Sequence, residues 1–248
     1  MEQFLTRLGQ DLGFRMADSK LMWAHGQLRF CSRYFLKPGE SLVHGAEIFW
    51  GYLDDQQFVE DIEAADESRN VFSFQVVQDA ILHAYPDEAE DIVGEFVRML
   101  LYDAIVGNND RHFYNWGVIS HPEAKIRPYF SPIYDTARAF YWNASESKLK
   151  VLYADKNQYR VKLKKYAELS RPKIGWDGAM NLNHFDLISK VRGCSDQCRS
   201  IVDGFERSMV LQAAEQLLFD GEFTELMSEL RRRIIIDCLE ERLNSMRF

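Results

Sequence analysis

The sequence predicts an α+β protein that is mainly helical. Apolar residues recur at helical spacing over residues 43–106 and again over 184–245. Two shorter runs of bulky apolar residues, 20–23 and 27–35, meet at His25-Gly26 and indicate a β-hairpin. The apolar fraction of 46% and the charged fraction of 27% are those of an ordinary folded protein. We therefore expect a helical body that carries a small antiparallel sheet.

The chain is expected to open in a helix over residues 1–13. Its apolar residues share one helical face, and a glycine follows where helices commonly stop: Phe4, Leu8, Leu12 and Gly13. The hairpin comes next, and a Pro-Gly turn at residues 37–40 ends that sheet. The N-terminal part should therefore consist of one helix and two strands.

Four helices are predicted between residues 43 and 106, because polar residues or prolines interrupt the apolar pattern three times. They are expected at 44–53, 56–65, 73–84 and 88–106. The last of them has two adjacent apolar stripes and should be buried almost all round. A polar loop at 107–115 follows, and then extended segments at 116–119 and 126–134. These two segments predict a hairpin above the buried helix.

The remainder of the chain is predicted to be helical again. The clearest segments are 184–191, 195–219 and 222–245, with Gly221 as the break between the last two. No internal repeat, low-complexity tract or long linker is found in the sequence. The C-terminal part should therefore be a helical layer joined directly to the preceding one.

Charge and cysteine content exclude several classes of protein. The net charge of −8 and the scattered basic residues argue against direct binding of nucleic acid. No run reaches the roughly 18 apolar residues that a membrane span requires. The four cysteines are too few and too unevenly spaced for a disulfide framework, and only Cys194 and Cys198 are close enough to suggest a zinc pair, without a second pair at a complementary spacing. We expect a cytoplasmic protein with free thiols.

A polar loop, Gly107 to Gly117, carries the residues that suggest chemistry. Phosphoryl transfer needs a carboxylate to accept the proton of the attacking hydroxyl, together with oxygen ligands that hold Mg²⁺ against the phosphates. Asp110 and Asn115 supply both kinds of group, five residues apart as in the catalytic loop of protein kinases. A second carboxylate, Asp135, ends the next extended segment, where kinases place their main metal ligand. The alternative is a turn whose Asn and Asp side chains satisfy only local backbone groups.

Neighbouring side chains allow two interpretations each. His112 either takes part in catalysis or fixes the loop by a hydrogen bond, and Arg111 either contacts phosphate or is solvated. Arg138 either binds phosphate or anchors the segment after Asp135. The basic run formed by Lys162, Lys164 and Lys165 is expected to be a solvated face, and the cluster Phe140-Tyr141-Trp142 is expected to pack.

These motifs resemble those of the HipA-like kinases, bacterial Ser/Thr kinases known from toxin–antitoxin systems. Residues 2–35 resemble the family's helix, two strands and hinge, and residues 72–134 resemble its helix and catalytic loop, which end at a metal-binding Tyr-Asp. The resemblance implies an ATP- and Mg²⁺-dependent kinase acting on a protein substrate. By this resemblance Asp110 would be the catalytic base, with His112 nearby, and Asn115 and Asp135 would be the Mg²⁺ ligands. Ser32, Arg33 and Tyr34 would form the hinge facing adenine. Glu2 would be the acidic residue that pairs with the ATP-contacting lysine.

The same resemblance divides the chain into an N-lobe remnant, residues 1–42, and a helical C-lobe, residues 43–248. A glycine-rich loop and its lysine would precede the first helix, and no Gly-x-Gly-x-x-Gly occurs elsewhere in the sequence. A truncated chain or start site, a partner that supplies the missing part, or a degenerate kinase would each account for this. The alternative function is a non-catalytic, pseudokinase-type module that docks an antitoxin-like or other protein partner.

Overall fold

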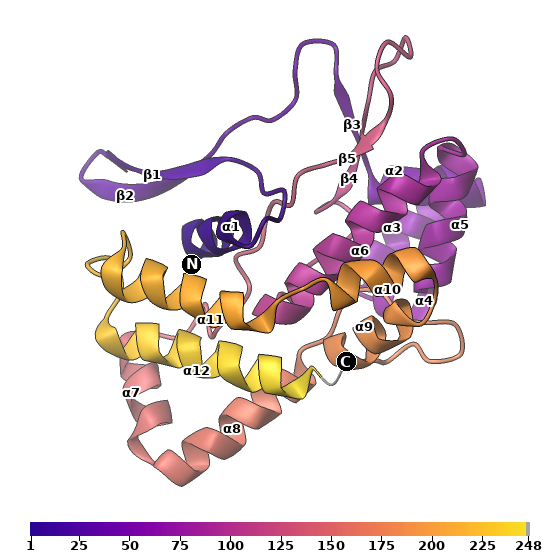
Figure 1. Ribbon diagram of the computed structural model, residues 1–248. Helices are drawn as coiled ribbons and strands as arrows, with labels where there is room; N and C mark the ends of the chain where they lie inside the picture. Colours follow the sequence, from indigo (N-terminus) through magenta and orange to yellow (C-terminus); the bar gives the residue numbers. More distant parts are fainter. Residues whose placement is uncertain (247–248) are drawn as a thin grey trace.

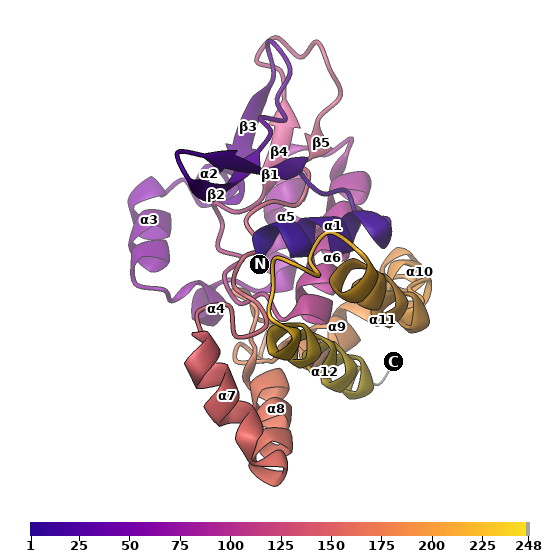
Figure 2. The ribbon, with the colours of Figure 1, turned by 90° about the vertical axis from the view of Figure 1, so that its left-hand side faces the viewer.

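The computed structural model describes residues 1–246 and confirms a mainly helical α+β fold (Figure 1). Helix α1 (Glu2–Asp11) lies beneath a two-stranded antiparallel hairpin, β1 (Ser19–Ala24) and β2 (Gln27–Ser32). Figure 2 shows α1 between this hairpin and the C-terminal helices. The predicted helix and hairpin are therefore confirmed, although the second strand ends at Ser32 and not at residue 35.

The hairpin turns at His25 and Gly26, whose φ angles of 50° and 72° suit the tight turns that match strand twist. Its register places Leu21 opposite Phe30 and Trp23 opposite Leu28. These pairs share one face, since residues directly opposite in a sheet point to the same side. Trp23 is nevertheless 73% exposed. The hairpin thus presents an apolar face that the described residues cover only in part.

A helical layer follows, and each predicted helix is found within a few residues of its expected bounds. The helices are α2 (Gly45–Leu53), α3 (Gln56–Ala64), α5 (Phe74–Ala84) and α6 (Ala89–Val106), with an additional short helix α4 (Ser68–Val71). Asp55 and Ser73 accept hydrogen bonds from the first turns of α3 and α5, which explains where those helices begin. Helix α6 is buried along most of its length, as its two apolar stripes predict.

A three-stranded sheet covers one end of α6. Strands β4 (Gly117–Ser120) and β5 (Tyr129–Phe130) form the predicted hairpin, with Ile119 opposite Tyr129. A third strand, β3 (Ser41–His44), pairs antiparallel with β4. The expectation that helical structure begins at residue 43 was therefore wrong, because Val43 and His44 take part in long-range strand pairing that local periodicity does not reveal. The division of the chain at residue 42 stays a prediction, and β3 runs across it.

The C-terminal helices form a further layer beside α6. They are α7 (Glu146–Ala154), α8 (Lys156–Leu169), α9 (His184–Arg192), α10 (Asp196–Asp203), α11 (Arg207–Glu215), a π-helical turn η1 (Gln216–Asp220) and α12 (Glu229–Ser245). The single helix predicted over 195–219 is in fact two, because the chain leaves the helix at Gly204 and restarts after Glu206. The helix predicted from 222 begins only at Glu229, where Ser228 caps it.

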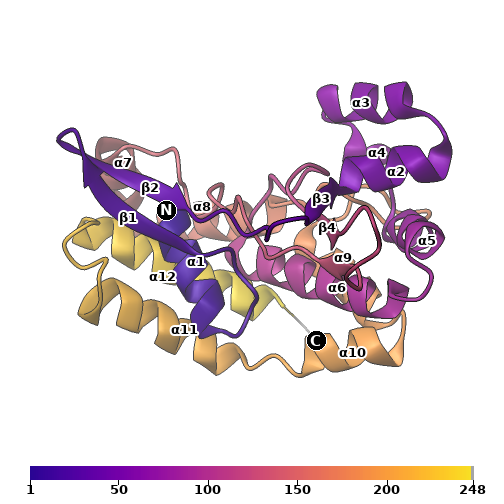
Figure 3. The same cartoon turned by 90° about the horizontal axis from the view of Figure 1, so that it is seen from above.

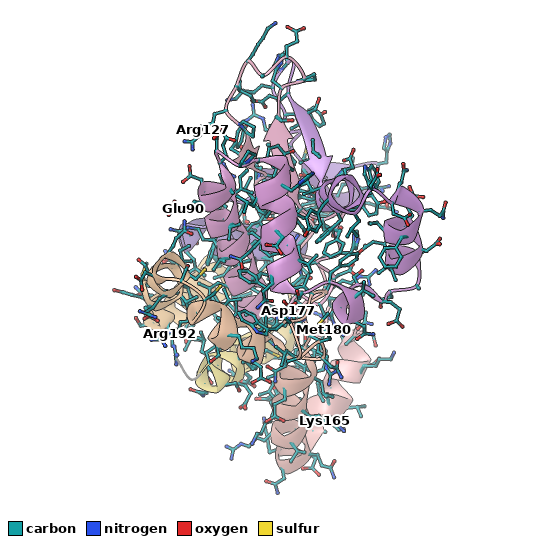
Figure 4. The ribbon with its side chains drawn as sticks, turned by 90° about the vertical axis from the view of Figure 1, so that its right-hand side faces the viewer. Glu90, Arg127, Lys165, Asp177, Met180 and Arg192 are labelled. Carbon is teal, nitrogen blue, oxygen red and sulfur yellow. The ribbon has the colours of Figure 1, made fainter. Side chains whose placement is uncertain are left out.

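Figure 3 shows the hairpin β1–β2 and helix α3 at opposite ends of the molecule, with α6 between them. In Figure 4, Arg127 lies near the end of α6 that carries Glu90. Lys165 lies on α8, at the opposite end of the molecule. The predicted basic run on α8 is exposed, as expected for a solvated face. Among residues 1–246, no helix is long and apolar enough to cross a membrane.

Candidate functional site

The polar loop begins where α6 ends, and two features fix that point. Gly107 has a φ of 76°, and its N–H donates to the carbonyl of Asp103 at 2.8 Å, so the helix closes with a left-handed cap. From α12, the guanidinium of Arg242 donates to the carbonyl of Ala104 through Nε at 2.9 Å and Nη2 at 2.7 Å. The start of the loop is therefore held by the last helix of the chain.

A buried ion pair supports the loop from below. Arg111 Nε and Nη2 each donate to a different carboxylate oxygen of Asp103 at 2.9 Å, and the two side chains are 3% and 1% exposed. Burial by itself lowers the pKa of Arg111, but the charge and the hydrogen bonds of Asp103 outweigh burial and raise that pKa above its ordinary value. Arg111 is thus neither solvated nor free to contact phosphate, contrary to both interpretations drawn from the sequence.

The same guanidinium joins the loop to the segment that carries Asp135. Arg111 Nη1 donates to the carbonyl of Asn115 at 2.8 Å and also to the carbonyl of Tyr134. Because one nitrogen contacts both carbonyls, the end of the loop and the predicted metal-binding segment lie side by side. The structure therefore brings the regions of Asn115 and Asp135 together around a buried arginine.

Asn115 is oriented by the loop itself. Its Nδ2 donates to the backbone carbonyl of Asp110 at 2.9 Å, and the residue is 5% exposed. The amide oxygen has no hydrogen-bond donor among the described residues. Since the amide nitrogen is engaged, the oxygen is the atom left to serve as a ligand.

The carboxylate of Asp110 contacts one cation. Arg138 Nε lies 2.9 Å from Asp110 Oδ2, and the side chains of Arg138 and Asp110 are 52% and 15% exposed. Asn108, itself bonded to Asp103 through Nδ2 at 3.0 Å, accepts the N–H of Asp110 at 3.3 Å through its side-chain oxygen. Asp110 is therefore a largely covered carboxylate whose backbone is tied to the buried ion pair.

Asp135 is exposed and adopts a left-handed backbone with a φ of 52°. This conformation is uncommon for residues other than glycine and often marks a functional segment. The preceding Tyr134 is anchored at both ends, because its carbonyl accepts from Arg111 and its hydroxyl donates to the carbonyl of Tyr114 at 3.0 Å. The chain thus holds Asp135 at the surface while fixing the residue before it.

The donors at this site suit Mg²⁺. The exposed carboxylate of Asp135 and the amide oxygen of Asn115 are hard oxygen ligands, and Mg²⁺ commonly takes one or two protein oxygens together with water and phosphate oxygens. Among residues 1–246 there is no group of three or more His, Cys, Asp or Glu side chains that could hold a metal ion. The pair therefore fits a metal that arrives with phosphates better than a metal held by the protein alone.

His112 has mainly local contacts. Its Nδ1 accepts the N–H of Tyr114 at 3.3 Å, and its backbone carbonyl accepts the N–H of Asn115 at 2.8 Å. Glu63 Oε2 lies 4.0 Å from the same Nδ1, but a nitrogen that accepts from a backbone N–H has no proton to give to that carboxylate. These contacts fit the loop-fixing interpretation, and a catalytic role for His112 stays a prediction.

The predicted hinge residues Ser32, Arg33 and Tyr34 are all exposed. The N–H of Arg33 donates to the carbonyl of Asp18 at 2.7 Å, which ties the segment to the residue that precedes β1. Directly after them, the ring of Phe35 lies 5.6 Å from that of Tyr134. The hinge segment therefore leads to the residue that precedes Asp135, although none of its three side chains forms a hydrogen bond, ion pair or ring contact with the loop among the described residues.

Glu2, on the first turn of α1, also lies close to the site. Burial raises its pKa above the ordinary value, and the negative charge of Asp135 raises it further. No lysine is paired with Glu2 among the described residues. Glu2 therefore lies near Asp135, and its pairing with an ATP-contacting lysine stays a prediction.

Helix, loop, hairpin and Tyr-Asp segment together define a kinase-like fold, and comparisons with solved structures agree. The proinflammatory kinase CtkA of Helicobacter pylori is similar over 98% of this chain and 82% of its own, with a TM-score of 0.74 and 16% identity. HipA of Shewanella oneidensis, solved with HipB and its operator DNA, is similar over 99% of this chain and 54% of its own, with a TM-score of 0.57 and 16% identity. The chain thus spans about half of that HipA.

The model of the family described as "HipA-like C-terminal domain" matches residues 1–210. The chain belongs to this family, which confirms the resemblance found in its motifs. A comparison with curated protein sequences found no match.

Two supporting residues escaped the sequence analysis. Asp103 carries a charge within a helix predicted to be buried all round, and this alone signals a buried partner, because charges are almost never buried unpaired. Arg242 offers no such signal: its helix is polar overall, and only the tertiary structure shows the residue to be fully buried against α6.

Proposed function

We propose that the chain is the catalytic part of an ATP- and Mg²⁺-dependent kinase that phosphorylates serine or threonine in a protein substrate. The observation that carries the proposal is the pair of bonds from Arg111 Nη1 to the carbonyls of Asn115 and Tyr134, which bring the end of the loop beside the residue that precedes Asp135. Asp110 is the proposed base, and Asn115 and Asp135 are the proposed Mg²⁺ ligands.

In the proposed reaction, the acceptor hydroxyl attacks the γ-phosphorus of ATP and its proton passes to Asp110. The bond between the γ-phosphorus and the bridging oxygen breaks, and ADP leaves with that electron pair. Mg²⁺, when bound, neutralises the phosphate charge. Asn115 and Asp135 would hold it, and residues 32–34 would face the adenine.

A lobe-completing protein segment is part of the proposal. Glu2 has no lysine partner among the described residues, and the sequence contains no glycine-rich loop of the kinase pattern. The hairpin face formed by Leu21, Phe30, Trp23 and Leu28 is partly uncovered and borders a cavity of about 490 Å³ next to Glu2. An added segment that supplies the loop and lysine would cover this face and complete the ATP site.

A protein partner of the antitoxin kind is the second element of the proposal. The similar HipA was solved together with HipB.

A cytoplasmic location is proposed on the thiols: Cys31, Cys194, Cys198 and Cys238 are free, and Cys194 is exposed, which suits a reducing compartment.

The alternative function is a module that docks partners without catalysis, and the uncovered hairpin face is the observation that favours it. Nucleotide binding separates the two. ATP with Mg²⁺ should raise the melting temperature of the chain, since a ligand that binds only the folded state stabilises it. Addition of a lobe-completing protein should enlarge the shift. A melting temperature that ATP leaves unchanged at every Mg²⁺ concentration, with and without that protein, would favour the docking module.

A further inference from the structure

Two arginines flank Asp110 in different ways. Arg111 is buried and uses its whole guanidinium on Asp103 and two carbonyls. Arg138 is 52% exposed, and among residues 1–246 its one ion pair is the 2.9 Å bond from Nε to Asp110 Oδ2. Its guanidinium otherwise lies over the ring of Trp142, 5.6 Å from the ring centroid, and Trp142 is itself 47% exposed. Arg111 is therefore fixed, whereas Arg138 has a single bond to exchange.

That bond occupies one of the two oxygens of the proposed base. A general base must lie within about 2.6–3.2 Å of the hydroxyl whose proton it accepts. Asp110 Oδ2 has Arg138 Nε at that distance, so a hydroxyl that approaches this oxygen meets Arg138 there. The Asp110 side chain is largely covered, but the Arg138 side chain is half-exposed, so water can solvate the guanidinium when it leaves the carboxylate.

The nearest new anion for the released guanidinium is the phosphoryl group itself. In phosphoryl transfer the attacking oxygen lies in line with the γ-phosphorus, so a cation displaced by that oxygen is next to the equatorial phosphate oxygens. Arginine matches phosphate geometry through paired N–H groups and stays charged at any ordinary pH. The carboxylates around this position are those of Asp110, Asp135, Glu2 and Asp66, and Asp66 is paired with Lys173. Arg111 is already neutralised by Asp103.

From these contacts we infer that Arg138 is a further catalytic residue, which leaves Asp110 when ATP binds and donates to the γ-phosphate. The inference rests on the proposed kinase function and deepens it. Before nucleotide binds, Arg138 occupies one oxygen of Asp110. With ATP bound, it frees that oxygen and stabilises charge on the group being transferred. One exchange of partners thus links nucleotide binding to the availability of this oxygen.

The test compares ATP with ADP, which lacks the γ-phosphate. Dissociation constants of both nucleotides with Mg²⁺ are measured by calorimetry on the full chain and on Arg138→Met. Loss of a charge-assisted hydrogen bond corresponds to about tenfold in affinity. Arg138→Met should therefore bind ATP about tenfold more weakly and ADP as the unchanged chain does. Arg138→Lys, which keeps the charge, should retain part of the preference for ATP and also serves if the Met variant is unstable.

Arg199→Met is the matched control. Arg199 is 53% exposed and binds one carboxylate, that of Asp196, at 3.0 Å, but it lies on α10 away from the loop. Its replacement should change neither constant. If Arg138→Met weakens ATP and ADP equally, or neither, Arg138 is not a γ-phosphate ligand and the inference is overturned while the kinase proposal stands. If the unchanged chain binds neither nucleotide, alone or with a lobe-completing protein, both are overturned together.

Discussion

Arg111 and Asp103 form a buried ion pair in which both terminal oxygens of the carboxylate accept, each at 2.9 Å. The pair lies beneath the loop of Asp110 and reaches, through Arg111 Nη1, the carbonyls of Asn115 and Tyr134. The relative position of the proposed base and metal ligands therefore depends on a charge pair that itself touches no substrate.

We expect Asp103→Asn to destabilise the protein strongly. Removing one partner of a buried ion pair leaves the other charge uncompensated and costs about 3–5 kcal/mol. The free energy of unfolding, measured by urea denaturation, should fall by that amount. Asp196→Asn, which removes the exposed partner of Arg199, is the control and should change the free energy of unfolding by less than about 1 kcal/mol. Equal effects for the two variants would contradict a special role of the buried pair.

Replacement of Arg242 should loosen the start of the loop. Arg242 is fully buried and donates to the carbonyls of Ala104, Ile105 and Ala167, with no carboxylate partner in the described structure. Burial lowers the pKa of Arg242 to about 10, so it remains protonated at neutral pH. Arg242→Met leaves these carbonyls without donors, and unsatisfied buried groups cost about 1–3 kcal/mol each.

The measurement is hydrogen exchange of the amides at residues 107–115, which should become faster in Arg242→Met. The control is Arg233→Met on the same helix, because Arg233 is 57% exposed and pairs only with Glu229 one turn away. Faster exchange throughout the chain, with no excess in the loop, would show that Arg242 contributes only to global stability.

The two carboxylates of the proposed site should differ in how their loss responds to metal. Asp110→Asn removes the proton acceptor and keeps the shape, so phosphate transfer from labelled ATP should fall by roughly 10²- to 10⁴-fold at any Mg²⁺ concentration. Asp135→Asn weakens a metal ligand instead, and excess Mg²⁺ should restore part of its activity. The assay needs the lobe-completing protein if the chain alone is inactive. If excess Mg²⁺ restored the activity of Asp110→Asn, Asp110 would be a metal ligand and not the base.

His184 should make the fold sensitive to mild acid. Burial, and then the charge of Arg242, lower its pKa well below 6.5, so the folded state keeps the imidazole neutral. Below pH 6.5 the unfolded state binds a proton that the folded state does not, and stability therefore falls as pH falls. The slope approaches about 1.4 kcal/mol per pH unit.

The free energy of unfolding, followed between pH 7 and 5.5, should show this loss in the unchanged chain and a flatter profile in His184→Gln. His83→Gln is the control, because His83 is exposed on α5. Glu2, whose pKa is raised, and the N-terminal amine, whose pKa is lowered, are present in both proteins, so the difference between the two profiles reports His184. A slope that persists in His184→Gln would assign the acid sensitivity to other groups.

Local sequence determined most of the elements and the chemistry of the loop. Helices α1, α2, α3, α5 and α6 follow from apolar spacing, with side-chain caps at the starts of α3 and α5, and the β1–β2 hairpin follows from two apolar runs around His25-Gly26. Two local motifs indicate the family from the sequence alone. They are the five-residue step from Asp110 to Asn115 and the pair Tyr134-Asp135 after the next extended segment. These features are local, so residues near one another in the chain are enough to encode them.

Only the tertiary structure decided what supports that loop. Strand β3 exists because it pairs with β4, Arg111 is buried because Asp103 of α6 lies beneath it, and Arg242 reaches the end of α6 from the far end of the chain. The position of Arg138 on Asp110 likewise depends on how the segment after Asp135 folds back. These contacts join separate elements, from 8 residues apart for Arg111 and Asp103 to 138 for Arg242 and Ala104. Their free energy arises from strand pairing, burial and charge pairing, which local periodicity does not encode.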